Sequence, residues 1–311
     1  FGNESCIMIS CTEFIPLYSE LFQYLEELGG HEEVVRHWNA ISDSTVADAL
    51  GKAVRKAGIR GCWDYWSKSL NEEACDFRLE LDEEAGTFLI DMRRCPSKGQ
   101  LLDYPHIEPY YDYCGHCPAL YDRALKKYGI HPAGHDLSHT DEARCVFRYA
   151  VDEKKLGGEK LSMNRLASDN EYFHRDFHSS MNMGVEYVGM AHGTQDVIDY
   201  LVMYTNDVYK PVINAIKSDP MGAIENKIRE TYRQEKADDV LQIEKDENTL
   251  CVKILHCPAV KHLKETGRVV SSWFYLTTQV VMKTLAEHAG LSFTMEYYDE
   301  ETGAAKYRFD R

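Results

Sequence analysis

Two segments of the chain repeat one alternation of apolar and polar positions. Residues 79–96 read LELDEEAGTFLIDMRRCP, and residues 241–258 read LQIEKDENTLCVKILHCP. Each places an acidic turn between two apolar runs and ends in Cys-Pro, and the two align without a gap. The turns end in Gly86 and Asn248, two residue types that tolerate positive φ. Each segment is therefore predicted to be a β-hairpin, and the chain is predicted to contain two copies of one unit.

Helical spacing of apolar residues precedes each predicted hairpin. It covers residues 31–58 in the first copy and residues 194–219 in the second. Pro211 should kink or split the second of these helices, because proline lacks a backbone donor and clashes with the preceding turn. A further short helix is predicted near 63–70 and near 224–234.

Each Cys-Pro is followed by a short helix, a further helix and a second hairpin. The further helices are predicted at 118–128 and 277–288, and Gly129 and Gly290 suit the positions that follow them. The second hairpins pair 130–138 with 144–149 and 291–298 with 305–309. We therefore expect an α+β fold with two tandem repeats, each of helices packed on a four-stranded, mainly antiparallel sheet built from two hairpins.

The region 151–170, VDEKKLGGEKLSMNRLASDN, is charged and contains two adjacent glycines. It is predicted to be a linker, with a long surface loop as the alternative, because the repeat resumes beyond it. The first α+β repeat, with an N-terminal helical segment, would then occupy 1–150, and the second would occupy 171–311.

Composition limits the classes of partner. The 311 residues are 44% hydrophobic, enough for ordinary cores, and carry a net charge of −16. That charge argues against nucleic acid, because phosphate contacts need a basic face. No apolar run approaches the roughly 20 residues of a membrane helix, and no signal peptide is visible. We expect a cytoplasmic protein that acts on a small molecule without a membrane or nucleic-acid partner, and a homo-oligomer is possible.

The chain has ten cysteines. They suggest a reducing cytoplasm, as in an anaerobe, where clustered cysteines indicate metal or thiol chemistry. Cys114-Gly-His-Cys117 matches the string of disulfide isomerases, but no parallel βαβ pattern surrounds it. Together with Cys95 and Cys145 it predicts a four-thiolate zinc site in the first copy. The second copy keeps only Cys257, and separate reduced thiols are the alternative.

Residues 103–121, DYPHIEPYYDYCGHCPALY, hold five tyrosines and two histidines. Prolines and a glycine interrupt both periods, so an ordered loop that enters a helix at Pro118 is predicted. Loops with this polar aromatic content often line sites. The candidates here are His106, Tyr110 and Tyr113 for substrate binding and Glu108 for catalysis.

A histidine-rich stretch opens the second copy. His174 and His178 are spaced i,i+4, so on a helix they would share one face, which Glu186 continues. Two histidines and a carboxylate can ligate zinc or iron, or can act as a general base with an orienting acid. The stretch is not HExxH, and an amphipathic helix with inert histidines is the alternative. The corresponding first-copy region, near 15–30, has no histidine.

A third candidate lies at 255–263, LHCPAVKHL. Cys257 near histidines could be a nucleophile, or it could be a core residue before a helix-starting proline. The first copy has Cys95 and its proline without those histidines. We therefore assign Cys-Pro mainly to the fold and His262 to function, with Thr277 facing the same pocket as a substrate-binding residue.

Several common motifs are missing. The sequence has no P-loop, GxGxxG, GxSxG or EF-hand loop, which disfavours nucleotide cofactors, Rossmann dehydrogenases and α/β-hydrolases.

The second half, with FHSSMNMGVEYVGMAHGTQDVIDYL, VKILHCPAVKHL and TTQVVMKTLAEHAG, resembles the L-2-amino-thiazoline-4-carboxylic acid hydrolase family. The first half, with RRCP, DYCGHCPALY and TDEARCVFRY, resembles it more loosely. The resemblance implies hydrolytic opening of a small heterocycle at a C=N carbon. The family's FH motif falls on Phe177-His178 and its Cys-Pro motif on Cys257-Pro258, with His262 downstream. The chain departs from the family pattern by being a tandem.

These observations predict a cyclohydrolase in which water attacks a ring C=N, amide or cyclic diketone carbon. His178, helped by Glu186 or Glu108, would act as base, and His262 or a tyrosine such as Tyr110 would protonate the departing group. Zinc or another divalent metal could activate the water instead. The alternative is a zinc-stabilised small-molecule sensor without turnover, although no output domain is obvious in the sequence.

Overall fold

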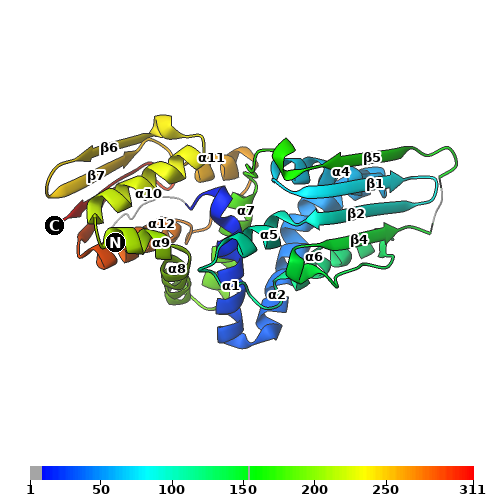
Figure 1. The fold of residues 1–311 in the computed structure, drawn as a ribbon, viewed down its shortest axis with the longest axis horizontal. Coiled ribbons are helices and arrows are strands. Elements are labelled where there is room, and N and C mark those ends of the chain that lie inside the picture. Colours follow the sequence, from blue (N-terminus) through cyan, green and yellow to red (C-terminus); the bar gives the residue numbers. More distant parts are fainter. Residues whose placement is uncertain (1–8, 153–154) are drawn as a thin grey trace. The chain divides into compact units, whose positions relative to one another are not determined.

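The computed structural model describes residues 9–152 and 155–311. They form an α+β protein with two antiparallel sheets (Figure 1). The chain divides into two compact units. The copy-one unit is Phe22–His174, and the copy-two unit combines the described residues up to Leu21 with Arg175–Arg311. Helix α1 (Phe14–Gly29) begins in the copy-two unit and ends in the copy-one unit.

The copy-one unit has a five-stranded sheet in the order β3-β4-β2-β1-β5. Its strands are β1 (Asp76–Asp82), β2 (Thr87–Arg94), β3 (His131–Pro132), β4 (Cys145–Ala150) and β5 (Lys160–Arg165). Its helices after α1 are α2 (His31–Ile41), a π-helical stretch (Ser42–Gly51), α3 (Lys52–Ala57), α4 (Arg60–Ser69), α5 (Pro96–Asp103) and α6 (His116–Lys126).

The copy-two unit has a four-stranded sheet in the order β6-β7-β9-β8. Its strands are β6 (Leu241–Lys245), β7 (Thr249–Ile254), β8 (Ser292–Tyr298) and β9 (Ala305–Asp310). Its helices are α7 (Phe177–Ala191), α8 (Thr194–Val208), α9 (Lys210–Ile216), α10 (Pro220–Gln234), α11 (Pro258–Glu265) and α12 (Leu276–Ala289).

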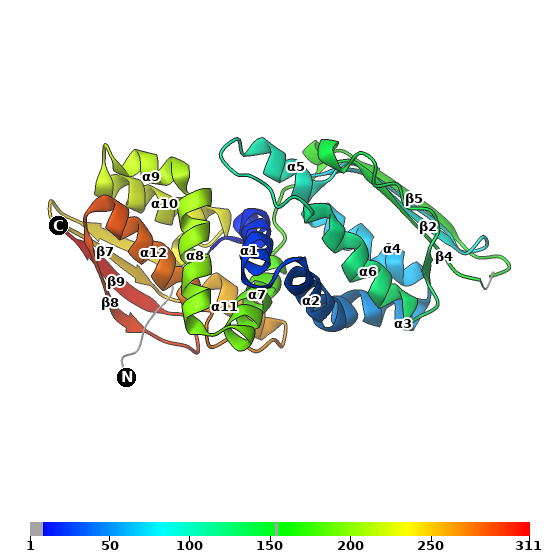
Figure 2. The same cartoon turned by 90° about the horizontal axis from the view of Figure 1, so that it is seen from below.

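The helices of each unit lie on one face of its sheet (Figure 2). In β1, Phe77, Leu79 and Leu81 alternate with more exposed residues and are buried. In α4, Trp66 stacks on Phe88 of β2 with ring centroids 5.5 Å apart. Every second strand residue thus forms a buried face of the sheet, and this face packs against the apolar stripes of the helices to form one core per sheet.

The predicted duplication agrees with the topology. The strand order β3-β4-β2-β1 in the first sheet matches the order β8-β9-β7-β6 in the second. Each strand of copy one therefore holds the same position in its sheet as the corresponding strand of copy two. The predicted split at Pro211 is also observed, because α8 ends at Val208 and α9 begins at Lys210.

Two predicted boundaries were wrong. The region 151–170 is not a plain linker, because it contains β5, which pairs antiparallel with β1 and adds a fifth strand to the first sheet. Charged residues are typical of edge strands as well as of linkers, so the composition of this region did not distinguish the two. The described residues before Phe22, predicted to belong to the first repeat, lie in the copy-two unit.

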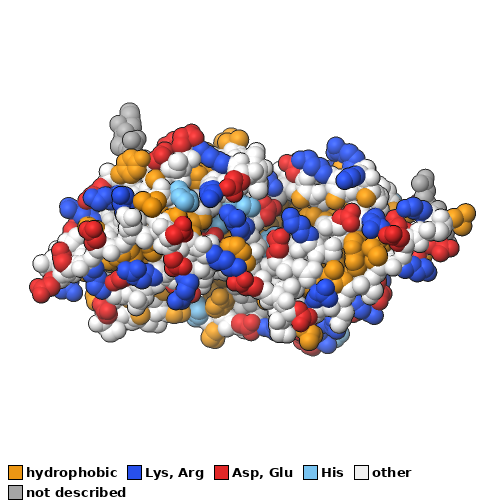
Figure 3. Space-filling view, turned by 90° about the horizontal axis from the view of Figure 1, so that it is seen from above, with side chains coloured by type: hydrophobic (Ala, Val, Ile, Leu, Met, Phe, Trp, Pro, Cys, Tyr) orange, Lys and Arg blue, Asp and Glu red, His pale blue; other side chains and the backbone are white. Residues whose placement is uncertain are grey.

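Two features of the described chain concern its surface. No helix there has both the length and the apolar character needed to span a membrane. On the face shown in Figure 3, acidic and basic side chains are interspersed.

Candidate functional site

A buried group of three side chains lies in the copy-two unit. Cys11, His178 and Glu235 each place one potential ligand atom within 4.8 Å of the others. Among the described residues this is the one group of three or more His, Cys, Asp or Glu side chains that meets this limit. Such a group could hold a divalent ion or carry out acid–base chemistry.

The ends of three helical elements contribute these side chains. Cys11 opens the 3₁₀ turn Cys11–Glu13, which Ser10 and Glu13 close as a capping box. His178 lies in the first turn of α7, just after the N-cap residue Asp176. Glu235 is the C-cap residue that directly follows α10. Side chains at helix ends can converge without interrupting the helices that hold them.

Glu235 accepts hydrogen bonds from the backbone and the thiol of Cys11, and it also contacts Ser10 and His178. Its Oε1 accepts from the Cys11 backbone N–H at 2.6 Å and from Ser10 Oγ at 3.0 Å, and its Oε2 lies 3.1 Å from His178 Nε2. Burial alone would raise the pKa of Glu235, but His178 and the Cys11 donors outweigh burial and lower the pKa to about 2. The carboxylate is therefore ionised at neutral pH, and its oxygens are already engaged, which favours acid–base chemistry over metal ligation.

Cys11 is not a ready nucleophile. Burial, and then the negative charge of Glu235, raise the pKa of the Cys11 thiol well above its usual range. The thiol is therefore protonated at neutral pH, and only a thiolate attacks efficiently.

His178 keeps one nitrogen available. Its ring is fully buried, and its Nδ1 has no hydrogen-bond partner among the described residues. The ring of His262, on α11, lies 6.2 Å from the ring of His178 between centroids. His262 Nε2 is 3.5 Å from Asp176 Oδ1, so a second carboxylate–histidine pair adjoins the first.

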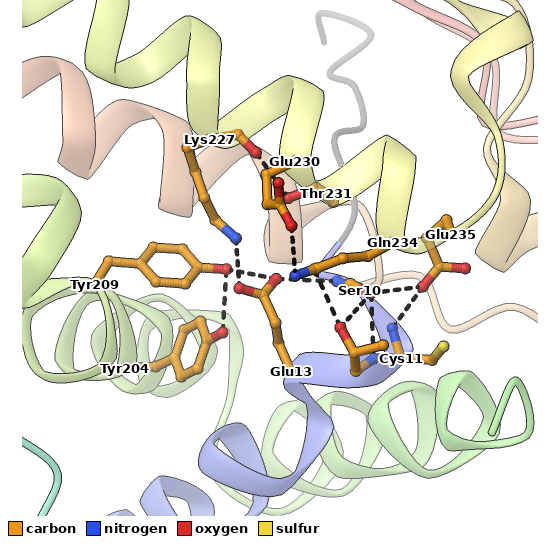
Figure 4. Close-up of polar contacts among 11 residues, drawn as sticks. Ser10, Cys11, Glu13, Tyr204, Tyr209, Lys227, Glu230, Thr231, Gln234 and Glu235 are labelled. Carbon is orange, nitrogen blue, oxygen red and sulfur yellow. Dashed lines mark hydrogen bonds and ion pairs between the residues drawn. The ribbon is translucent and has the colours of Figure 1, made fainter. Parts of the chain in front are cut away.

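A second polar cluster fastens the Cys11 turn to α10 (Figure 4). Glu13 forms an ion pair with Lys227 and accepts a hydrogen bond from the Tyr209 hydroxyl at 3.1 Å. The Lys227 ammonium also lies 4.4 Å from the centre of the Tyr209 ring. Thr12 Oγ1 donates to Gln234 Oε1 at 3.1 Å. These contacts hold the turn so that Cys11 and Ser10 reach Glu235.

The predicted catalytic residues divide into two groups. His178 and His262 are brought together. Glu186 is not beside His178 but about 12 Å farther along α7, where it accepts a hydrogen bond from Ser271. Glu108 is exposed in the copy-one unit, where its carbonyl accepts from Gln23 at 2.7 Å.

The predicted pairing of His174 with His178 on one helical face was wrong. Helix α7 begins at Phe177, so His174 precedes it and belongs to the copy-one unit. There its Nδ1 lies 2.6 Å from Glu72 Oε2. The i,i+4 spacing spans no helix, because α7 starts only after Asp176, two residues beyond His174.

Cys257 and Thr277 are buried and support the fold around the site. Cys257 is the N-cap residue of α11, and its N–H donates to Thr302 O at 2.9 Å. A Cβ added at Gly303 would lie 2.3 Å from Cys257 Cβ, so the two residues pack very closely. Thr277 Oγ1 donates to Phe274 O at 2.7 Å.

The tyrosine-rich loop lies in the copy-one unit. Tyr110 and Tyr113 are buried there, and the Tyr110 hydroxyl donates to Glu26. Burial, followed by that bond, raises the pKa of Tyr110. His106 is half-buried against Tyr104, with ring centroids 5.8 Å apart. Helix α6 begins at His116, so Pro118 is the third helical residue and not the first.

The four predicted zinc ligands line one cavity. Cys95, Cys114, Cys117 and Cys145 all line one cavity of about 30 Å³ in the copy-one unit. Burial first, and then the nearby thiols of the other three, raise the pKa of Cys117 well above its usual range. The cavity is large enough for one small bound species, since a single water needs roughly 10–15 Å³.

Cys11 and Glu235 were not predicted from the sequence. The ungapped alignment that pairs the two hairpins also places Glu235 opposite Glu73, six residues before each hairpin segment. Both glutamates are buried. Extending the repeat upstream would therefore have found Glu235, whereas nothing in the sequence indicates that the Cys11 turn reaches the copy-two unit.

Comparison with known proteins adds no family to this geometry: no family model, no curated protein and no solved structure matches the chain.

Proposed function

We propose that the protein is a hydrolase that opens the ring of a small cyclic substrate, with His178 of the copy-two unit as general base. The observation that carries this proposal is the fully buried His178, which has Glu235 on one ring nitrogen and no hydrogen-bond partner on the other.

The pairing with Glu235 suits a base. A carboxylate that accepts from Nε2–H fixes the tautomer in which Nδ1 keeps its lone pair, and it stabilises the imidazolium formed after proton transfer. Glu235 is ionised, as this role requires. A positioned base of this kind typically contributes about 10²–10⁴-fold in rate.

His262 supplies the complementary acid. In the proposed reaction a water molecule gives a proton to His178 Nδ1 while its oxygen bonds to a ring carbon of a C=N, amide or cyclic diketone group. The ring bond to the leaving nitrogen or carbon then breaks, and the leaving atom takes a proton from His262, whose Nε2 lies 3.5 Å from Asp176 Oδ1. The nucleophile is water, because the Cys11 thiol is protonated.

The test is hydrolysis of a panel of thiazolines, lactams and cyclic 1,3-diketones, with products identified by mass as the substrate plus one water. We expect turnover of at least one ring class, and a loss of about 10²–10⁴-fold in His178→Gln. The matched control is His288→Gln, an exposed histidine in the last turn of α12, which should keep wild-type turnover.

Two outcomes contradict the proposal. Equal turnover by wild type and His178→Gln would remove His178 from the chemistry. Tight binding of a panel compound without any product would instead support the binding-module alternative.

A further inference from the structure

Three separate elements of the copy-one unit bring cysteines to one cavity. Cys95 is the N-cap residue of α5, Cys114 and Cys117 flank the first residue of α6, and Cys145 begins β4. All four are half-buried, and none forms a disulfide. The cavity that they line measures about 30 Å³.

We propose that these four cysteines bind one zinc ion as thiolates, in a closed structural site. Four sulfur ligands in a tetrahedron are the usual environment of structural zinc, with Zn–S bonds of about 2.3 Å. No three of these sulfurs lie within the 4.8 Å limit met by Cys11, His178 and Glu235, so ion binding must draw them together. This inference is independent of the proposed hydrolase activity.

The surroundings suit a site that carries excess negative charge. Four thiolates around Zn²⁺ leave two negative charges. Residues in the first turns of α5 and of α6 line the cavity, and helix N-termini favour negative charge. Cys95 Sγ already accepts the Lys98 backbone N–H at 3.5 Å. Lys98 and Arg144 also line the cavity.

The second copy lacks this ligand set. It keeps Cys257 opposite Cys95, but Tyr275 and Thr278 stand where Cys114 and Cys117 would be. The site is therefore a property of one copy, and a single zinc ion per chain is expected. Zinc there would fasten α5, α6 and β4 to one another.

The first test is elemental analysis of the full chain, purified without oxygen, beside Cys114→Ser/Cys117→Ser. The matched control is Cys251→Ser, a half-buried cysteine on β7 of the copy-two unit. We expect one zinc per chain in wild type, Cys251→Ser and His178→Gln, and loss of the zinc in the double variant.

A second measurement on wild type guards against misfolding of that variant. Titration with an organomercurial, with a chromogenic chelator present, should release the zinc as four thiols react. Cobalt substitution should give thiolate-to-cobalt charge-transfer absorption.

Four results would overturn the inference. The first is no metal in wild type together with a Cys114–Cys117 disulfide in the mass spectrum, which would indicate a redox pair. Iron with acid-labile sulfide would indicate a cluster. Zinc that is kept by the double variant but lost in Glu235→Gln would place the ion at the Cys11 group. Zinc release without reaction of four thiols would exclude this ligand set.

Discussion

At the scale of single residues, the two copies use one buried glutamate in opposite ways. Glu73 and Glu235 occupy equivalent positions of the repeat. Burial raises the pKa of Glu73 to about 7, whereas His178 and the Cys11 donors outweigh burial and lower the pKa of Glu235 to about 2. The buried glutamate thus has a raised pKa in copy one, and the histidine that only copy two carries lowers the pKa of its counterpart.

We expect Glu235→Gln to lower the free energy of unfolding at pH 7 by about 1–3 kcal/mol, because His178 loses a charged hydrogen-bond partner. A lowered folded-state pKa stabilises the protein above the unfolded value of 4.5 and loses this effect as pH falls toward about 2. The difference between wild type and variant, measured by urea denaturation, should therefore narrow once the pH drops below 4.5.

The matched variant, Glu73→Gln, should raise the free energy of unfolding instead of lowering it. A raised folded-state pKa costs stability as pH rises from the unfolded value of 4.5 through about 7. The neutral glutamine avoids this cost, so the variant should gain up to about 3 kcal/mol at about pH 8 and little at about pH 4. If the free energy of unfolding depended on pH in the same way in both variants, the two glutamates would not differ as proposed.

At the scale of elements, periodicity predicted most of the fold and missed what tertiary contacts decide. Both hairpins and the split at Pro211 follow from local pattern. Strand β5 was missed, because a short charged edge strand is defined by the free edge of β1 and not by its own apolar content. His174 was placed on a helix because spacing alone does not say where a helix starts.

The polar cluster that fastens the Cys11 turn to α10, with Glu13 and Lys227 at its centre, should contribute strongly to the stability of the copy-two unit. We expect Lys227→Met to cost about 3–5 kcal/mol, because it leaves the largely buried Glu13 carboxylate without its cation. Denaturant unfolding measures this cost. Cysteine reactivity should rise as well, because the released turn would expose Cys11 to an alkylating reagent.

The control for this prediction is Lys210→Met. Lys210 pairs with Asp207 at 2.9 Å, but both side chains are largely exposed, and such pairs contribute about 0–1 kcal/mol. Similar destabilisation by the two substitutions would mean that the pair of Glu13 and Lys227 acts as an ordinary surface ion pair.

At the scale of the whole molecule, comparing the copies with each other identified the candidate sites better than any motif did. Three cysteines that copy two lacks, Cys114, Cys117 and Cys145, lie at one cavity with Cys95, and the histidines that copy one lacks, His178 and His262, lie close together in the copy-two unit. Cys11 escaped this comparison, because the turn that carries it precedes the first copy in sequence but packs in the copy-two unit. A contact between segments so far apart leaves no local pattern in the sequence.

Because each unit has its own sheet and core, removing metal from the full chain should have a local effect. With a zinc chelator present, we expect faster amide hydrogen exchange in α5, α6 and the start of β4, which the four thiolates would otherwise hold together. Exchange in α7 and α10 should not change, since their contacts around Glu235 involve none of those cysteines. Cys251→Ser should reproduce the wild-type map with and without chelator. An equal rise throughout both units would mean that the ion stabilises the chain as one cooperative body, and a rise confined to α7 and α10 would place it beside His178.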